Sequence, residues 1–332
     1  MIRKEWMYIL LLLLCACSGK VDIELPMHEC TPIPSPRAAS TCFVYQGKAY
    51  IYGGRDSAGQ YLSDMWCYDP IADQWKDLGE TPLKPRVNAT ACVENGIVYI
   101  GLGFNGRYGN ETAYFNDWWR YNPATGDWQK LASYPNHHTD RAVSFANGNQ
   151  LYVGYGFQWT YTRDMFSYHI PTNRWDSIDV NVAFLGYPAR SFGGCGAVCG
   201  GRYFYGSGYR GESLDWWAEF IPSSEGENCT AGEWQRRKAV PGNGRTLSAA
   251  AATDNYVYLT CGFRYGGIGT DGHTYNDIQR YDPQTNKWAC AGMLPGGLMN
   301  HIAFSIDNAV YVGIGENDEE QLVPSLYKII EQ

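Results

Sequence analysis

The fold is decided by the stretch Asn116-Asp117-Trp118-Trp119-Arg120-Tyr121-Asn122-Pro123-Ala124-Thr125-Gly126-Asp127-Trp128. Its first half is rich in aromatic residues, which favour β-strands, and the Asn-Pro and Gly that follow favour a turn. A second strand then opens with Trp128. The stretch therefore predicts a β-hairpin.

The same pattern returns along the chain, each time with seven residues from a Tyr to a Trp. The pairs are Tyr68 and Trp75, Tyr121 and Trp128, Tyr168 and Trp175, and Tyr281 and Trp288. A further copy, which runs from Asp215 to Trp234, carries an insertion in its turn. A recurring hairpin of this kind indicates a repeat protein.

A second periodic mark is a pair of residues, closed by Gly, that ends a strand. The pairs recur at intervals of 49 to 54 residues: Gly53-Gly54, Leu102-Gly103, Tyr155-Gly156, Ser207-Gly208, Cys261-Gly262 and Ile314-Gly315. Before each pair lie a strand of small residues and a tight turn such as Asn95-Gly96. One repeat is thus four strands: A with small residues, B ending in the pair, C ending in Tyr and D opening with Trp. Four strands in such a period are typical of a β-propeller blade.

The Gly pair, the Tyr–Trp spacing and the turn Asp282-Pro283-Gln284-Thr285 resemble the Kelch repeat over residues 37–330. The resemblance implies an all-β fold, a six-bladed β-propeller of Kelch type. The sixth copy has no D strand, and residues 23–37 end like the other D-to-A junctions. We therefore expect the ring to be closed by an N-terminal outer strand, because an open ring would leave a sheet edge unpaired.

The first residues predict export and lipid attachment. Arg3 and Lys4 precede an apolar run over 7–14 that is too short to span a bilayer, so we interpret it as a signal peptide. The sequence Leu14-Cys15-Ala16-Cys17 resembles the bacterial lipobox, which implies that Cys17 is diacylated. An ordinary cleaved signal that happens to contain Cys is the alternative.

The expected organisation is a lipoprotein signal peptide over 1–16, a tether over 17–22 and the propeller over 23–332. The expected location is the bacterial outer membrane, with the lipid anchor as the only membrane contact. The net charge of −8 argues against nucleic acid as a partner. Nine of the 11 cysteines follow Cys17 at irregular spacing, so we expect most to be buried apolar side chains rather than a disulfide framework.

Strand order places the B–C loops and the D–A junctions on one face of the ring. These segments supply the candidate ligand-binding residues Arg55, Phe104, Trp159, Tyr209, Arg210, Phe263, Arg264 and Tyr265. Guanidinium and aromatic groups suit an anionic or sugar-like ligand. The repeated arginines at the D–A junctions, Arg37, Arg86 and Arg245, are instead expected to bridge adjacent blades through loop carbonyls and the Asp before strand C. We expect the repeated Trp residues to pack between blades.

No catalytic or metal-binding pattern emerges from the sequence. The six histidines form no pair at i, i+2 or i, i+4, so no metal site is expected. Galactose oxidase and the sialic acid epimerases also have Kelch propellers, but neither the copper ligands of the first nor the active-site segments of the second find a match here. We expect a monomeric, non-enzymatic lipoprotein without cofactor that binds a glycan or a protein. The alternative is a sugar-modifying enzyme, such as an N-acetylneuraminate epimerase or a lyase.

Overall fold

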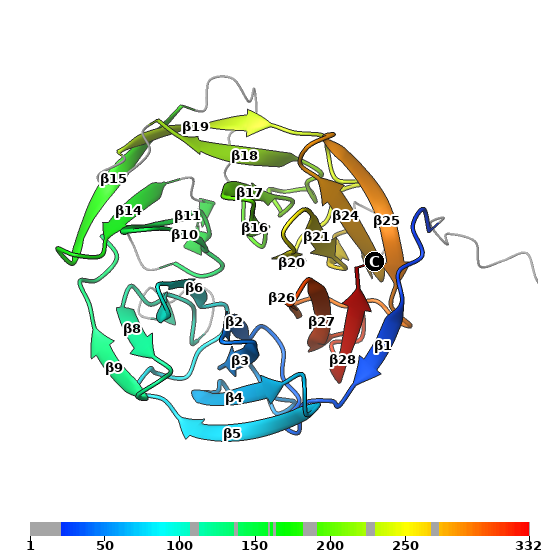
Figure 1. Cartoon of the computed structure of the whole chain (residues 1–332), viewed down its shortest axis with the longest axis horizontal. Helices are drawn as coiled ribbons and strands as arrows, with labels where there is room; N and C mark the ends of the chain where they lie inside the picture. The colour runs from blue at the N-terminus through cyan, green and yellow to red at the C-terminus, as the bar shows by residue number, and fades with distance from the viewer. Residues whose placement is uncertain are drawn as a thin grey trace, which may run out of the picture.

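The described residues of the computed structural model are 21–106, 113–135, 139–158, 160–161, 164–181, 191–223, 230–266 and 272–331. They form an all-β propeller, in which antiparallel sheets are arranged around a central axis (Figure 1). The small-residue strands lie nearest the axis, and the D strands lie at the rim. Within the described part of the chain, no helix is long and apolar enough to cross a membrane.

Four blades are separate four-stranded sheets. The first consists of β2 (Thr41–Tyr45), β3 (Lys48–Tyr52), β4 (Asp64–Asp69) and β5 (Gln74–Glu80). The second consists of β6 (Thr90–Glu94), β7 (Ile97–Gly101), β8 (Trp118–Asn122) and β9 (Asp127–Lys130). Another consists of β20 (Ala249–Ala252), β21 (Val257–Thr260), β24 (Asp277–Asp282) and β25 (Lys287–Met293). The last consists of β26 (Ile302–Ile306), β27 (Ala309–Glu316), β28 (Leu322–Ile330) and β1 (Met27–Cys30).

The two remaining repeats form one eight-stranded sheet. One half consists of β10 (Val143–Asn147), β11 (Gln150–Gly154), β14 (Met165–His169) and β15 (Arg174–Asn181). The other half consists of β16 (Cys195–Cys199), β17 (Arg202–Gly206), β18 (Trp217–Pro222) and β19 (Ala231–Arg236). The end of β15 pairs in parallel with β19, Asp179 opposite Ala231 and Asn181 opposite Glu233. The sequence predicted six blades. The structure has four separate four-stranded blades, because the end of β15 joins the other two repeats into one sheet.

Two short ribbons extend from the B strands into the loops. They pair β12 (Phe157–Gln158) with β13 (Thr160–Tyr161) and β22 (Phe263–Arg264) with β23 (His273–Thr274).

The Gly that closes each repeated pair is required by close packing. A Cβ on Gly54 would lie 2.9 Å from the Ala38 carbonyl oxygen, and a Cβ on Gly103 would lie 2.6 Å from that of Val87. The first residue of the pair has a left-handed backbone, which the non-glycine residue Leu102 also adopts, with a φ of 62°. A larger residue can adopt that conformation at some cost, so the first Gly is replaced and the second is kept.

The N-terminal residues 21–34, which we call the clasp, close the ring. β1 pairs antiparallel with β28, so the predicted N-terminal outer strand is confirmed (Figure 1). Upstream, the Asp22 backbone N–H donates to the Cys290 carbonyl at 2.9 Å, on the neighbouring blade. Downstream, the Thr31 N–H donates to Asp73 at 2.9 Å, on the first blade. The clasp therefore contacts three consecutive blades.

Three of the repeated Trp residues, Trp75, Trp175 and Trp288, bind the junction that precedes their own blade. The indole N–H of Trp175 donates to the Ala132 carbonyl at 2.9 Å, and its ring lies 5.6 Å from Trp118 of the preceding blade. The Trp288 indole repeats the contact at the Lys238 carbonyl, at 2.8 Å. The predicted packing between blades is thus confirmed for these residues.

Candidate functional site

A pocket of about 590 Å³ opens around the axis, on the face that carries the B–C loops. We call it the mouth pocket. Its wall includes four of the predicted ligand-binding residues: Arg55, Phe104, Phe263 and Tyr265. They come from three blades, and strand order alone had placed them on one face. The structure brings these four together.

The other predicted residues lie elsewhere. The Tyr209 ring lies 4.5 Å from that of Tyr265, at the edge of the pocket. Arg210 and Arg264 are not part of the wall. Arg264 follows Phe263 in β22, and successive side chains of a strand point to opposite sides. Trp159 and Cys17 lie outside the described residues.

A ring of residues with positive φ forms the floor of the mouth pocket. Its members occupy one repeat position, two residues after the junction arginines: Ala39, Asn88, Arg141, Gly193, Leu247 and Asn300. The Ala39 N–H donates to the Asn300 carbonyl at 2.7 Å, and the Asn88 N–H donates to the Ala39 carbonyl at 2.9 Å. The Arg141 N–H donates in the same way to the Asn88 carbonyl, at 3.1 Å. A narrower pocket of about 140 Å³ follows along the axis, and all six residues contribute to its wall.

This floor ring was not predicted from the sequence. The position of the ring could have been read from the sequence, because its residues stand two positions after Arg37, Arg86 and Arg245. In the third repeat Thr139 takes the place of the junction arginine, sixteen residues before Tyr155, and Arg141 belongs to the ring.

An ion pair crosses one side of the mouth pocket. Arg55 Nη2 lies 2.6 Å from Glu316 Oε2, and Asn300 Nδ2 donates to Glu316 Oε1 at 2.7 Å. Glu316 is only 2% exposed, whereas a third of the Arg55 side chain is exposed. The remaining N–H groups of the Arg55 guanidinium have no other hydrogen-bond partner among the described residues. Glu316 therefore orients Arg55 and leaves several donors for a ligand.

A second charged pair lies on the floor. Arg141 Nη1 lies 2.7 Å from Asp140 Oδ2, which also accepts from Asn88 Nδ2 at 3.2 Å. Burial raises the pKa of Asp140, and the charge of Arg141 and the hydrogen bond from Asn88 offset only part of this effect. Asp140 is fully buried and is not part of the pocket wall, so its carboxylate holds the Arg141 side chain in place from outside the pocket.

The acidic groups around the mouth pocket outnumber the basic ones. Arg55 faces Glu316, Arg141 faces Asp140, and Glu320 adds a further carboxylate to the wall. The pocket therefore has no excess positive charge that would attract a polyanion. Tyr61, Phe104, Phe263 and Tyr265 contribute aromatic rings, and the Phe263 and Tyr265 rings meet edge to face at 5.0 Å. This arrangement suits a ligand with apolar ring faces and many hydroxyl groups.

The junction arginines have structural partners. Arg86 contacts both carboxylate oxygens of Asp117, at 2.5 and 2.8 Å, and donates to the Leu102 carbonyl at 2.9 Å. Arg37 and Arg245 make the equivalent contacts with Asp64 and Asp277. The predicted partners are confirmed. The bridge between adjacent blades is also confirmed for Arg86 and Arg245, whose backbone N–H groups donate to the Leu62 and Leu214 carbonyls of the preceding blade at 3.0 Å.

The described cysteines are free thiols, and six of the eight are buried. Burial raises the pKa of Cys42, Cys92 and Cys195 to about 12, so these thiols stay protonated near neutral pH. Within the described ranges, no group of three or more His, Cys, Asp or Glu residues could hold a metal ion.

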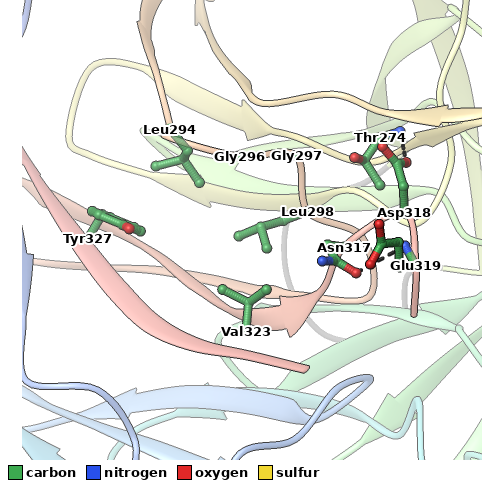
Figure 2. Close-up of a pocket in the computed structure, with 10 residues that line it drawn as sticks. All are labelled: Thr274, Leu294, Gly296, Gly297, Leu298, Asn317, Asp318, Glu319, Val323 and Tyr327. Atoms are coloured by element: carbon green, nitrogen blue, oxygen red, sulfur yellow. Dashed lines mark hydrogen bonds between the residues drawn. The ribbon is translucent and has the colours of Figure 1, made fainter. Parts of the chain in front are cut away.

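A third pocket, of about 290 Å³, lies between the last two blades (Figure 2). We call it the side pocket. Leu294, Leu298 and Val323 line it, together with Asp318 and Glu319 from the B–C loop of the last blade. The sequence analysis did not predict it, because it is formed by the packing of two blades.

Comparison with known proteins identifies the family to which this chain belongs. Residues 24–208 match the KLHDC2/KLHL20/DRC7 Kelch-repeats domain, which is more than half of the chain. The chain belongs to the Kelch-repeat family. Kelch-like protein 23 of Homo sapiens is 25% identical over 259 residues, which are 76% of this chain and 41% of that protein. The Kelch-repeat chain thus spans less than half the length of this relative.

A shorter similarity concerns an enzyme. The N-acetylneuraminate epimerase of Shigella sonnei (strain Ss046) is 32% identical over 90 residues, which are 26% of this chain and 23% of the enzyme. Among solved structures, that of YjhT superimposes with a TM-score of 0.73 at 19% identity, covering 91% of this chain and 97% of the other. At that identity the superposition shows a shared propeller fold.

Proposed function

We propose that the protein binds a carbohydrate in the mouth pocket. The observation that carries this proposal is the combination of aromatic walls with paired polar groups in one concave site. Aromatic rings stack on the apolar faces of sugars, and the Arg55–Glu316–Asn300 group offers fixed donors and acceptors to hydroxyls. The volume of about 590 Å³ is within the range of small-molecule sites. Because the pocket is concave, it fits a glycan better than it fits the flat surface of a protein partner.

The experiment is a binding screen of neutral and acidic mono- and oligosaccharides by isothermal titration calorimetry, with protein spanning residues 21–332. Phe263→Ala removes one aromatic wall, and we expect it to weaken the best ligand by about tenfold or more. The control is Ile71→Ala, which trims an apolar side chain that is 96% exposed on a C–D turn of the opposite face. Equal losses in both variants, or binding restricted to polyanions, would contradict the proposal.

A second candidate function is a sugar-modifying enzyme that uses the same pocket. The similarity to N-acetylneuraminate epimerase over 90 residues favours it. The test is to incubate the protein with N-acetylneuraminate and follow its epimers by proton NMR. Accelerated interconversion that is lost in Arg55→Ala would support enzymatic activity. An unchanged rate with intact binding would leave carbohydrate binding as the function.

We further propose that the eight-stranded sheet acts as two blades, so that the propeller has six. The support is the repetition of one four-strand order in each half of that sheet. The short apolar run and Cys17 support lipid anchoring of the propeller to a bacterial outer membrane.

A further inference from the structure

The side pocket is apolar at one end and acidic at the other. Leu294 and Leu298, each 2% exposed, form its base with Val323, and the backbone of Gly296 and Gly297 forms one wall. Figure 2 shows the apolar side chains grouped away from Asp318 and Glu319, which lie together at the opposite end. A ligand that lies along this pocket would therefore contact hydrocarbon at one end and carboxylates at the other.

The two carboxylates are not neutralised. Asp318 Oδ1 accepts the Thr274 backbone N–H at 2.5 Å, and the Glu319 carboxylate has no hydrogen bond or ion pair with the described residues. No Lys or Arg side chain belongs to the described lining. Both acidic residues are exposed, so their charge can be met by a cation from outside.

We propose that the side pocket binds an arginine side chain of a protein partner. The three methylene groups of arginine would cover Leu298 and Val323, as long cationic side chains do on apolar surface. Its planar guanidinium would lie between Asp318 and Glu319, where its several N–H groups can reach two carboxylates at once. The net charge of −8 on the whole chain would also speed encounter with a basic partner.

The site is separate from the mouth pocket, although the two share one turn. Glu319 lines the side pocket, whereas its neighbour Glu320 lines the mouth pocket. Likewise, Leu298 belongs to the side pocket and Met299 to the mouth pocket. The chain therefore provides a matched control, because the same Glu→Gln change one residue apart affects a different pocket.

The test uses the peptide acetyl-Ser-Gly-Arg-Gly-Ser-amide, with citrulline or lysine in place of arginine as control peptides. Binding to the protein is measured by saturation-transfer NMR at low salt. We expect millimolar affinity for the arginine peptide and about tenfold weaker binding of the citrulline peptide, which has the same shape without the charge. E319Q should weaken the arginine peptide by about threefold, and E320Q should leave it unchanged.

A second variant tests occupancy of the pocket. A Cβ on Gly296 would meet no atom within 4 Å, so Gly296→Leu adds a bulky side chain at the wall of the pocket without a clash at its Cβ. It should abolish peptide binding while the melting temperature stays within about 2 °C of the original. Absent binding, equal binding of the citrulline or lysine peptide, or full binding by E319Q or Gly296→Leu would overturn the assignment.

Discussion

Removal of the clasp, residues 21–34, should destabilise the propeller strongly. The clasp provides the outer strand of the last blade, and it buries Leu25 and Ile33, which are 9% and 2% exposed. It also joins the last blade to both neighbours through Cys290 and Asp73. Deletion would expose β28 as an open edge and uncover the apolar side chains beneath it.

The magnitude follows from these contacts. Burying a Leu or Ile side chain contributes about 1.5–3 kcal/mol each. Each hydrogen bond that the clasp makes adds a net ~1 kcal/mol. The clasp therefore contributes roughly 5 kcal/mol or more, which is comparable with the whole stability of many domains.

The assay is urea denaturation followed by tryptophan fluorescence, on protein spanning 21–332 and protein spanning 35–332. We expect the shorter protein to unfold at a much lower urea concentration, or to be partly unfolded without urea. Equal midpoints and equal slopes for the two proteins would refute the reasoning, and residues 21–34 would then be only a tether.

Three further predictions concern single residues. Trp175→Phe keeps an aromatic ring but loses the bond to the Ala132 carbonyl, so the free energy of unfolding should fall by about 1 kcal/mol; no change in urea midpoint would contradict this. Burial raises the pKa of Asp117, but hydrogen bonding and the charge of Arg86 outweigh it and hold the pKa below its usual value of 3.8. The pair therefore stabilises the fold above pH 4, and this stability is lost as pH falls through the lowered pKa. Asp117→Asn should be more destabilising at pH 7 than at pH 2 in thermal unfolding, and a constant difference would argue against the pair. Cys17→Ser should abolish palmitate labelling in a bacterium that processes lipoproteins, whereas persistent labelling would exclude Cys17 as the attachment site.

Much of the fold was predictable because the same local hydrogen bonds and close contacts constrain each repeat. The Tyr–Trp spacing recurs because the Trp175 and Trp288 indoles each bind the preceding junction. The second Gly of each pair recurs because backbone lies where a Cβ would be, as at Gly54. The joining of β15 to β19 was not predictable, since it depends on how far one outer strand extends beyond its own sheet.

The face that carries the mouth pocket was predictable, but its pairings were not. Arg55 and Glu316 stand 261 residues apart, and only closure of the ring places them in contact. Arg264 was predicted beside Phe263 from its chemistry, without regard for the alternation of side chains along β22. The side pocket could not be predicted either, because it depends on the packing of the last two blades.

The most direct test of carbohydrate binding is a crystal structure of the protein with the tightest ligand from the screen. We expect a sugar ring stacked on Phe263 or Tyr265, with hydroxyl groups within hydrogen-bond distance of Arg55 and Asn300. Ligand bound on the face of the C–D turns, or a mouth pocket that stays empty at saturating ligand, would contradict it.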